Sequence, residues 1–178
     1  MAETPEALTI EEHLFTDDGD VPNNPHLPLI VYCGVLETGP RAADACEALF
    51  TGNDWSAAWV DRIYAHHHYH STAHEVLGIA SGSARVRLGG ESGKTMELRA
   101  GDVVVIPAGV AHKSEEASTD LVVVGAYPGG RTPDMRRPGA QERERARRNI
   151  TEVALPACDP VYGTSGPLFE RWRGADRS

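Results

Sequence analysis

Residues 68–75 read HYHSTAHE and contain two histidines, His68 and His70, followed by a carboxylate at Glu75. On a β-strand, residues two apart point to the same face, so these two imidazoles can contact one ion. The four residues between His70 and Glu75 leave room for the chain to turn and return the carboxylate to the imidazoles. This stretch therefore predicts a metal site beside a strand.

A second stretch offers a fourth ligand. Gly101 is followed by Pro107, Gly109 and His112, and the Pro-Ala-Gly sequence at 107–109 is typical of a tight turn. His112 would then arrive from the far end of a second hairpin. Three neutral imidazoles and one carboxylate suit a divalent first-row metal, so we expect one Fe, Mn, Ni, Co or Zn ion per chain.

The two stretches resemble the paired signature motifs of the cupin superfamily. The first motif, His-x-His-x4-Glu-x6-Gly, matches His68, His70, Glu75 and Gly82. The second motif, Gly-x5-Pro-x-Gly-x2-His, matches Gly101, Pro107, Gly109 and His112. Further matches to the YjlB-like single-domain cupins of bacteria lie at residues 18–19, 22–24, 27–28, 67–71 and 123–128. The resemblance covers nearly the whole chain and implies a cupin fold, but it implies no particular substrate.

Two positions depart from the general cupin pattern. Arg62 stands where a glycine is expected six residues before the first histidine, and Glu116 stands where an asparagine often follows the last one. Both positions lie outside the expected ligand set. His74 and His66 are alternative ligands, because the first adjoins Glu75 and the second shares the strand parity of the two motif histidines. Glu75 is preferred because its spacing fits the motif.

The remainder of the pattern predicts an all-β fold, a cupin-type jelly-roll β-barrel with a few short flanking helices. Short β-rich segments are separated by Gly, Ser, Asp or Pro turns, without the alternation of strands and helices that marks a parallel sheet. The expected strands are residues 29–33, 59–70, 76–80, 84–88, 95–98, 103–106 and 121–127.

Two helices and an irregular tail are expected around these strands. Residues 42–50 and 136–148 have helical character, and residues 150–155 are expected to add a strand at the barrel edge. The last segment, 156–172, is expected to pack irregularly through Leu168, Phe169 and Trp172. We expect one domain over residues 1–178, with an N-terminal arm (1–54), a barrel core (55–130) and a C-terminal helix and tail (131–178).

Composition excludes several classes of function. The chain has 178 residues with 40% hydrophobic and 24% charged content, as is ordinary for a globular domain, and its formal charge of -9 disfavours nucleic acid and anionic membranes as partners. The apolar runs are too short to span a bilayer, and no signal peptide is recognisable. Three cysteines without close spacing favour a reduced, cytoplasmic location.

A glycine-rich stretch suggests an alternative site, for phosphate. Residues 89–95 read GGESGKT and resemble a phosphate-binding loop. However, only three residues separate Gly89 from Gly93, whereas that loop needs four, and a strand-like segment follows instead of a helix. We therefore expect a hairpin turn with a solvated Lys94.

The predicted metal site admits several functions on a small polar organic substrate. Four protein ligands on an octahedral ion leave two positions open, which suits an Fe(II)-dependent oxygenase. The same ligands around Mn, Ni or Zn suit a non-redox isomerase or decarboxylase. A non-catalytic binding module and a metal-free epimerase-like site are further alternatives. The full ligand set favours a metal-dependent enzyme, with oxygenase chemistry first.

Two further residues are candidates for catalysis. If residues 64–70 form one regular strand, Tyr64, His66, His68 and His70 lie in a row about 6.6 Å apart. Tyr64 and His66 would then reach a substrate beside the metal, where either could transfer a proton. The alternative is that both simply line the barrel. A homodimer is also expected, because an open jelly roll leaves strand edges that residues 29–33 could cover.

Overall fold

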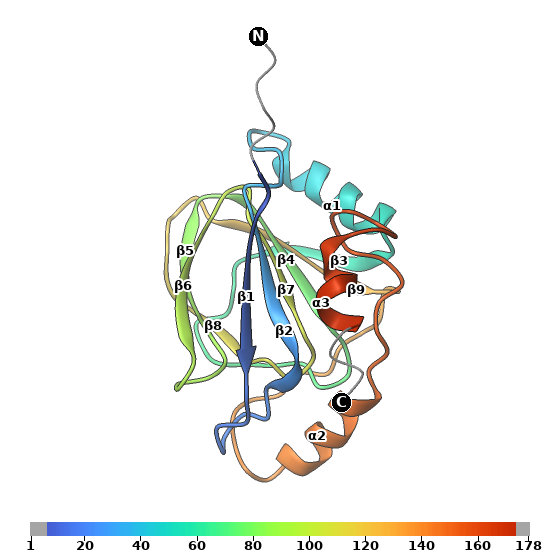
Figure 1. The fold of residues 1–178 in the computed structure, drawn as a ribbon. Coiled ribbons are helices and arrows are strands. Elements are labelled where there is room, and N and C mark those ends of the chain that lie inside the picture. The colour runs from blue at the N-terminus through green and yellow to red at the C-terminus, as the bar shows by residue number, and fades with distance from the viewer. Residues whose placement is uncertain (1–6, 174–178) are drawn as a thin grey trace.

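Nine strands in two antiparallel sheets make up the fold in the computed structural model, which describes residues 7–173 (Figure 1). The larger sheet has the order β1-β2-β7-β4-β9-β3, and the smaller has the order β6-β5-β8. The strands are β1 (Thr9–Phe15), β2 (Asn24–Cys33), β3 (Trp55–Asp61), β4 (Glu75–Ser81), β5 (Ser83–Leu88), β6 (Lys94–Arg99), β7 (Val103–Ile106), β8 (His112–Ala117) and β9 (Val122–Pro128).

Three helices flank the sheets. They are α1 (Ala42–Gly52), α2 (Arg143–Glu152) and α3 (Pro167–Arg173). Figure 1 shows α1 and α3 on the outer side of the larger sheet, with β5, β6 and β8 on its opposite side. The predicted all-β jelly roll with short flanking helices is confirmed, although the two sheets do not close into a continuous barrel.

The strand sequences explain why the larger sheet is buried on both faces. In β7 all four residues are apolar and buried, and their alternation divides them between two cores. Val104 and Ile106 face the smaller sheet, whereas Val103 and Val105 face the helices. β5, the central strand of the smaller sheet, instead alternates buried Val86 with exposed or half-buried arginines, as expected for a sheet with one solvated face.

The core between the larger sheet and the helices requires a close approach of α1 to the sheet. A Cβ atom on Gly78 of β4 would lie 2.4 Å from Sγ of Cys46 and 3.0 Å from Cζ of Phe50. The glycine therefore lets α1 pack directly on the strand. Trp172 of α3 extends the same core and donates its Nε1–H to the carbonyl of Pro28 at 2.9 Å.

Several predicted elements need correction. The predicted strand 59–70 is wrong, because β3 covers Trp55–Asp61 and the chain then crosses irregularly toward the smaller sheet. It meets β8 only intermittently, through a bridge between His68 and His112 and a hydrogen bond from Ser114 N–H to the Tyr64 carbonyl at 2.8 Å. Regular pairing is lost because the segment passes from one sheet to the other.

The C-terminal elements also differ from expectation. α2 begins at Arg143 instead of residue 136, since Arg136 pairs with Tyr69 in a β-bridge and Pro138-Gly139 follows it. The predicted edge strand 150–155 is wrong, because residues 150–152 form the last turn of α2. The tail 156–172 contains α3, and it is anchored as expected by buried Leu168, Phe169 and Trp172.

Other predictions are confirmed, and two strands were missed. Residues 89–93 form the turn of the β5–β6 hairpin, with Lys94 exposed. β1 and β8 escaped prediction because their sequences, TIEEHLF and HKSEEA, are dominated by polar residues. Among residues 7–173, no helix combines the length and the apolar character needed to cross a membrane.

Candidate metal centre

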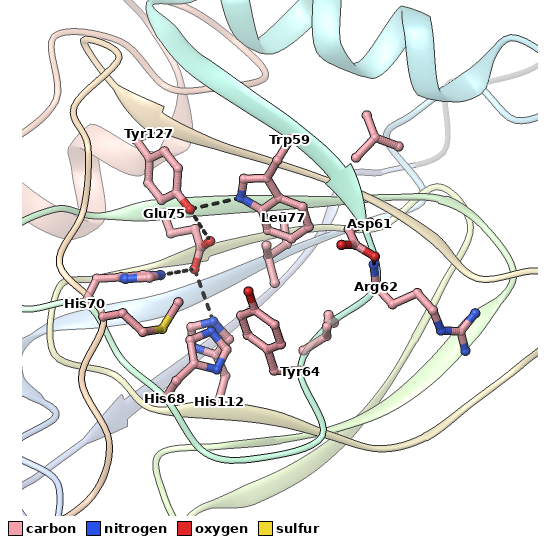
Figure 2. Close-up of a pocket in the computed structure, with 13 residues that line it drawn as sticks. Trp59, Asp61, Arg62, Tyr64, His68, His70, Glu75, Leu77, His112 and Tyr127 are labelled. Atoms are coloured by element: carbon pink, nitrogen blue, oxygen red, sulfur yellow. Dashed lines mark hydrogen bonds and ion pairs between the residues drawn. The ribbon is translucent and has the colours of Figure 1, made fainter.

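The four predicted ligands converge at the mouth between the sheets. His68 and His70 come from the crossing segment, Glu75 is the first residue of β4, and His112 is the first residue of β8. Their ligand atoms all lie within 4.8 Å of one another, and all four residues are buried (Figure 2). The structure therefore brings together side chains from both sheets and from the segment 62–74, which connects β3 to β4 and contacts β8 on the way.

Backbone carbonyls orient the three imidazoles. Nδ1 of His68 lies 3.4 Å from the carbonyl of His66, and Nδ1 of His70 lies 2.5 Å from the carbonyl of Asp134. Nδ1 of His112 lies 3.2 Å from the carbonyl of Val110. Because a carbonyl oxygen only accepts hydrogen bonds, each Nδ1 carries the proton. Each Nε2 then faces the cluster, and in the neutral imidazole it carries the lone pair that binds a metal.

Glu75 completes this arrangement with an unpaired oxygen. Its Oε2 lies 3.3 Å from Nε2 of His70 and 3.1 Å from Nε2 of His112. The carboxylate oxygen is buried and has no hydrogen-bond partner in the described part of the chain. A carboxylate oxygen this close to two imidazole nitrogens in a buried site requires a positive charge between them, either a proton or a metal ion. The residues present thus fit a divalent metal ion.

The protonation of the cluster follows from burial and proximity. Burial, aided by the neighbouring His112, lowers the pKa of His68 to about 3, so that imidazole is neutral. Burial alone would lower the pKa of His70, but the Glu75 carboxylate raises it above the usual imidazole value. Burial would likewise raise the pKa of Glu75, yet His70 and His112 hold it below the usual carboxyl range. Glu75 is therefore anionic.

A hydrogen-bonded chain holds the other oxygen of Glu75. Nε1–H of Trp59 donates to the Tyr127 hydroxyl at 2.9 Å, and that hydroxyl donates to Oε1 of Glu75 at 3.2 Å (Figure 2). Burial, followed by the Glu75 charge, raises the pKa of Tyr127, so its proton stays in place. This chain directs Oε2 toward the imidazoles.

A loop outside both motifs supports His70. The Asp134 carbonyl accepts from its Nδ1–H, and the Asp134 carboxylate accepts from Ser71 N–H at 2.7 Å, from Thr72 N–H at 3.2 Å and from Arg136 Nε–H at 2.6 Å. The loop is thereby fastened to the residues next to His70. Sequence reasoning missed Asp134 because a separation of 64 residues and no motif spacing connect it to the ligand.

His74 lies away from the centre. Its Nδ1 accepts the Ala108 N–H at 2.9 Å, its ring packs 4.8 Å from Trp172, and burial lowers its pKa to about 4. It therefore serves as a neutral core residue, in agreement with the choice of Glu75 as the ligand.

The two predicted catalytic residues have different surroundings. Tyr64 lines the cavity above the cluster and is 52% exposed, whereas His66 is absent from the residues that line it. The expected row of rings is wrong, because residues 62–70 do not form a regular strand and the rings gather instead. The ring centre of Tyr64 lies 5.1 Å from those of both His66 and His68, and those of His66 and His68 are 6.0 Å apart.

A cavity of about 220 Å³ opens over the cluster. Its remaining wall is largely apolar and includes Trp59, Val60, Ile63, Leu77 and Met135, with Asp61 and Arg62 at the edge. The cluster therefore has room beside it for a small organic molecule.

Comparison with known proteins agrees with the motifs. The cupin domain family matches residues 61–125. The uncharacterised protein YjlB of Bacillus subtilis strain 168 is 44% identical over 162 residues, which cover 91% of this chain and 96% of that protein. The chain belongs to the YjlB-like cupins.

Solved structures resemble this cupin more distantly. Acireductone dioxygenase from Bacillus anthracis, with cadmium in its active centre, matches with a TM-score of 0.36 and 20% identity over 51% of this chain and 62% of its own. An uncharacterised double-stranded β-helix protein from Klebsiella pneumoniae matches with a TM-score of 0.37 and 14% identity over 77% and 84%. Tomato vicilin matches with a TM-score of 0.38 and 17% identity over 66% of this chain and 31% of its own.

Proposed function

We propose that this cupin binds one divalent transition metal per chain through His68, His70, Glu75 and His112, and that it is a metal-dependent enzyme for a small organic molecule. The observation that carries the proposal is the buried cluster itself: the ligand atoms of three imidazoles and one carboxylate lie within 4.8 Å of one another, with Oε2 of Glu75 next to two imidazole nitrogens. Oxygenase chemistry is the favoured reaction class, because four protein ligands leave two positions open on an octahedral ion.

When bound, the metal supplies a Lewis acid, and a redox-active ion such as Fe(II) also supplies electrons for dioxygen chemistry. The protein contributes the rest. Apolar side chains such as Ile63 and Leu77 line the cavity beside the cluster, and the hydrogen-bonded chain from Trp59 through Tyr127 holds Glu75 in place. The Tyr64 hydroxyl makes no hydrogen bond within the described residues, so it is free to donate a proton to a substrate beside the cluster, with His66 stacked behind it.

The first experiment is elemental analysis of protein purified without added metal. We expect about one divalent metal ion per chain in the wild type and loss of most of it in His70→Ala. His66→Ala is the matched control, because it removes an imidazole of the same segment that is not part of the cluster, and it should keep its metal. Full metal retention by a folded His70→Ala variant contradicts the ligand assignment.

A non-redox isomerase or decarboxylase is the second candidate, and a non-catalytic binding module is the third. They are favoured by one observation: apart from Tyr64, the polar side chains that line the described cavity are engaged in hydrogen bonds or ion pairs. Iron together with substrate-dependent consumption of dioxygen supports the oxygenase. Turnover without dioxygen consumption supports the second candidate, and binding without turnover supports the third.

A further inference from the structure

The cavity is lined by two kinds of side chain. The four residues of the cluster are polar and buried. Beside them, Ile63 and Leu77 belong to the hydrophobic core between the sheets, with Trp59 packed against that core. The wall of the cavity is thus an extension of the core, and it favours apolar surface on any molecule that enters.

The two charged side chains that line the cavity outside the cluster, Arg62 and Asp61, already make hydrogen bonds with the protein backbone. Arg62 is the one cation among the described lining residues, and its guanidinium donates to the carbonyl of Ser118 at 2.9 Å and, at 3.5 Å, to those of Thr119 and Leu121. Figure 2 shows it directed away from the cluster. The Asp61 carboxylate accepts the Arg62 N–H at 2.7 Å. A second anionic group on a ligand would therefore find no free cation and would lie near a carboxylate.

The volume of the cavity limits the size of the apolar part of a ligand. An apolar cavity of about 150 Å³ holds a benzene-sized molecule. The cavity here has a volume of about 220 Å³, which also includes the space next to the ligand atoms. One ring, or a branched alkyl group of similar size, fits together with a small head at the metal.

We infer that the site takes a molecule with one oxygen-donor head that binds the metal, a compact apolar body such as a single ring, and no second charge. This inference rests on the proposed metal function and narrows its substrate class. Small dicarboxylates and phosphorylated sugars are excluded by the same argument, because each carries charge where the cavity wall offers apolar side chains.

Three hydroxamates with the same metal-binding head test this inference. Acetohydroxamate has a methyl body, benzohydroxamate has a ring, and 4-carboxybenzohydroxamate has a ring with a second charge. Their affinities for Zn²⁺-loaded protein are measured by calorimetry, and each is divided by the affinity of the same hydroxamate for free Zn²⁺. We expect benzohydroxamate to bind roughly tenfold or more tightly than acetohydroxamate, and the added carboxylate to remove that gain.

Variants of Met135 place the effect in the cavity. This residue lines the cavity and is 53% exposed, so its replacement leaves the core intact. Met135→Ala should lower the affinity for benzohydroxamate about threefold or more and leave the affinity for acetohydroxamate unchanged. Met135→Leu should preserve the preference for the ring. Leu14→Ala, at a similarly exposed site on β1 outside the cavity, should change neither affinity.

The outcomes separate the inference from the proposal beneath it. If elemental analysis finds metal and all three hydroxamates bind equally, or if the carboxylated ring binds best, the substrate class is wrong while the metal site stands. If the protein retains no metal after loading, the proposed function itself fails, and the inference fails with it.

Discussion

At the scale of single residues, the ligand set depends on side chains and carbonyls that no motif contains. His70 is held by the Asp134 carbonyl, and Asp134 is in turn fastened by its own carboxylate to the backbone of Ser71 and Thr72. The orientation of an imidazole in the proposed ligand set therefore depends on a carboxylate outside the cluster. Such supporting contacts commonly change metal affinity by about 10- to 100-fold.

Replacing Asp134 should weaken the binding of the metal without unfolding the protein. Asp134→Ala removes the carboxylate's hydrogen bonds to Ser71 and Thr72, while the backbone bonds from Asp134 N–H to Thr72 Oγ1 and between Tyr69 and Arg136 remain, so the carbonyl holds the His70 ring less firmly. We expect the dissociation constant for Zn²⁺ to rise about tenfold or more, measured by competition with a chelator, and the Co²⁺ absorption spectrum to change. The exposed Asp120→Ala is the control, and equal Zn²⁺ affinities in both variants would disprove the role of Asp134.

The spacing of the motifs was enough to predict the four clustered side chains, because each motif fixes its ligands relative to a strand and a turn. It could not predict Trp59, Tyr127 or Asp134. These residues reach the site from β3, β9 and a loop, and only the packing of the sheets brings them near Glu75 and His70. Residue patterns therefore identify ligands more readily than the groups that orient them.

At the scale of elements, prediction succeeded where apolar side chains determine the strand. β4, β7 and β9 lie inside the larger sheet, and their Val- and Ile-rich sequences reveal them. It failed for the polar edge strand β1 and for the crossing segment, whose conformation is imposed by contacts with β8. Helix α2 was displaced because Arg136 pairs with Tyr69, a contact 67 residues away that local sequence does not encode.

The attachment of the C-terminal tail to β2 predicts a specific response to alkaline pH. The hydroxyl of buried Tyr32 donates to Oδ2 of Asp159 at 2.5 Å, and the same carboxylate accepts N–H groups of Val161 and Leu168. Burial first, and then Asp159, raises the pKa of Tyr32 above its usual value of 10.0. The folded state thus keeps the neutral phenol after the unfolded chain has begun to ionise.

The contribution of Tyr32 to stability is therefore complete below about pH 10 and falls as the pH rises further, by up to about 1.4 kcal/mol per pH unit. Tyr32→Phe should be about 1 kcal/mol or more less stable at pH 8, and its difference from the wild type should shrink by pH 11. Urea unfolding of both proteins at each pH measures this. A difference that stays constant from pH 8 to pH 11 would show that the phenol does not titrate as argued.

At the scale of the whole molecule, the exposed edges of the larger sheet bear on assembly. Residues 29–33 were expected to cover an edge, but in β2 they pair with β1 on one side and with β7 on the other. The open edges are those of β1 and β3. The homodimer remains a prediction and now concerns these strands. Light scattering should give twice the 19.2 kDa chain mass at micromolar concentration, and the monomer mass would contradict it.

The same openness gives the proposed metal a structural role. The proposed ligands come from β4 in the larger sheet, from β8 in the smaller sheet and from the segment between β3 and β4, so one ion would tie together two sheets that do not close into a barrel. An ion that binds the folded chain alone stabilises it by about 2.7 kcal/mol when its free concentration is one hundred times its dissociation constant.

For a chain of 178 residues this corresponds to a rise in melting temperature of roughly 5–10 °C on adding Zn²⁺ to metal-free protein. Glu75→Gln should remove most of the rise, because it replaces the anionic ligand by a neutral amide of the same shape, whereas His66→Ala should retain it. Differential scanning calorimetry with and without a chelator makes the comparison. An equal rise in Glu75→Gln would place the stabilising ion elsewhere on the molecule, because only the proposed centre requires the charge of this carboxylate between the two sheets.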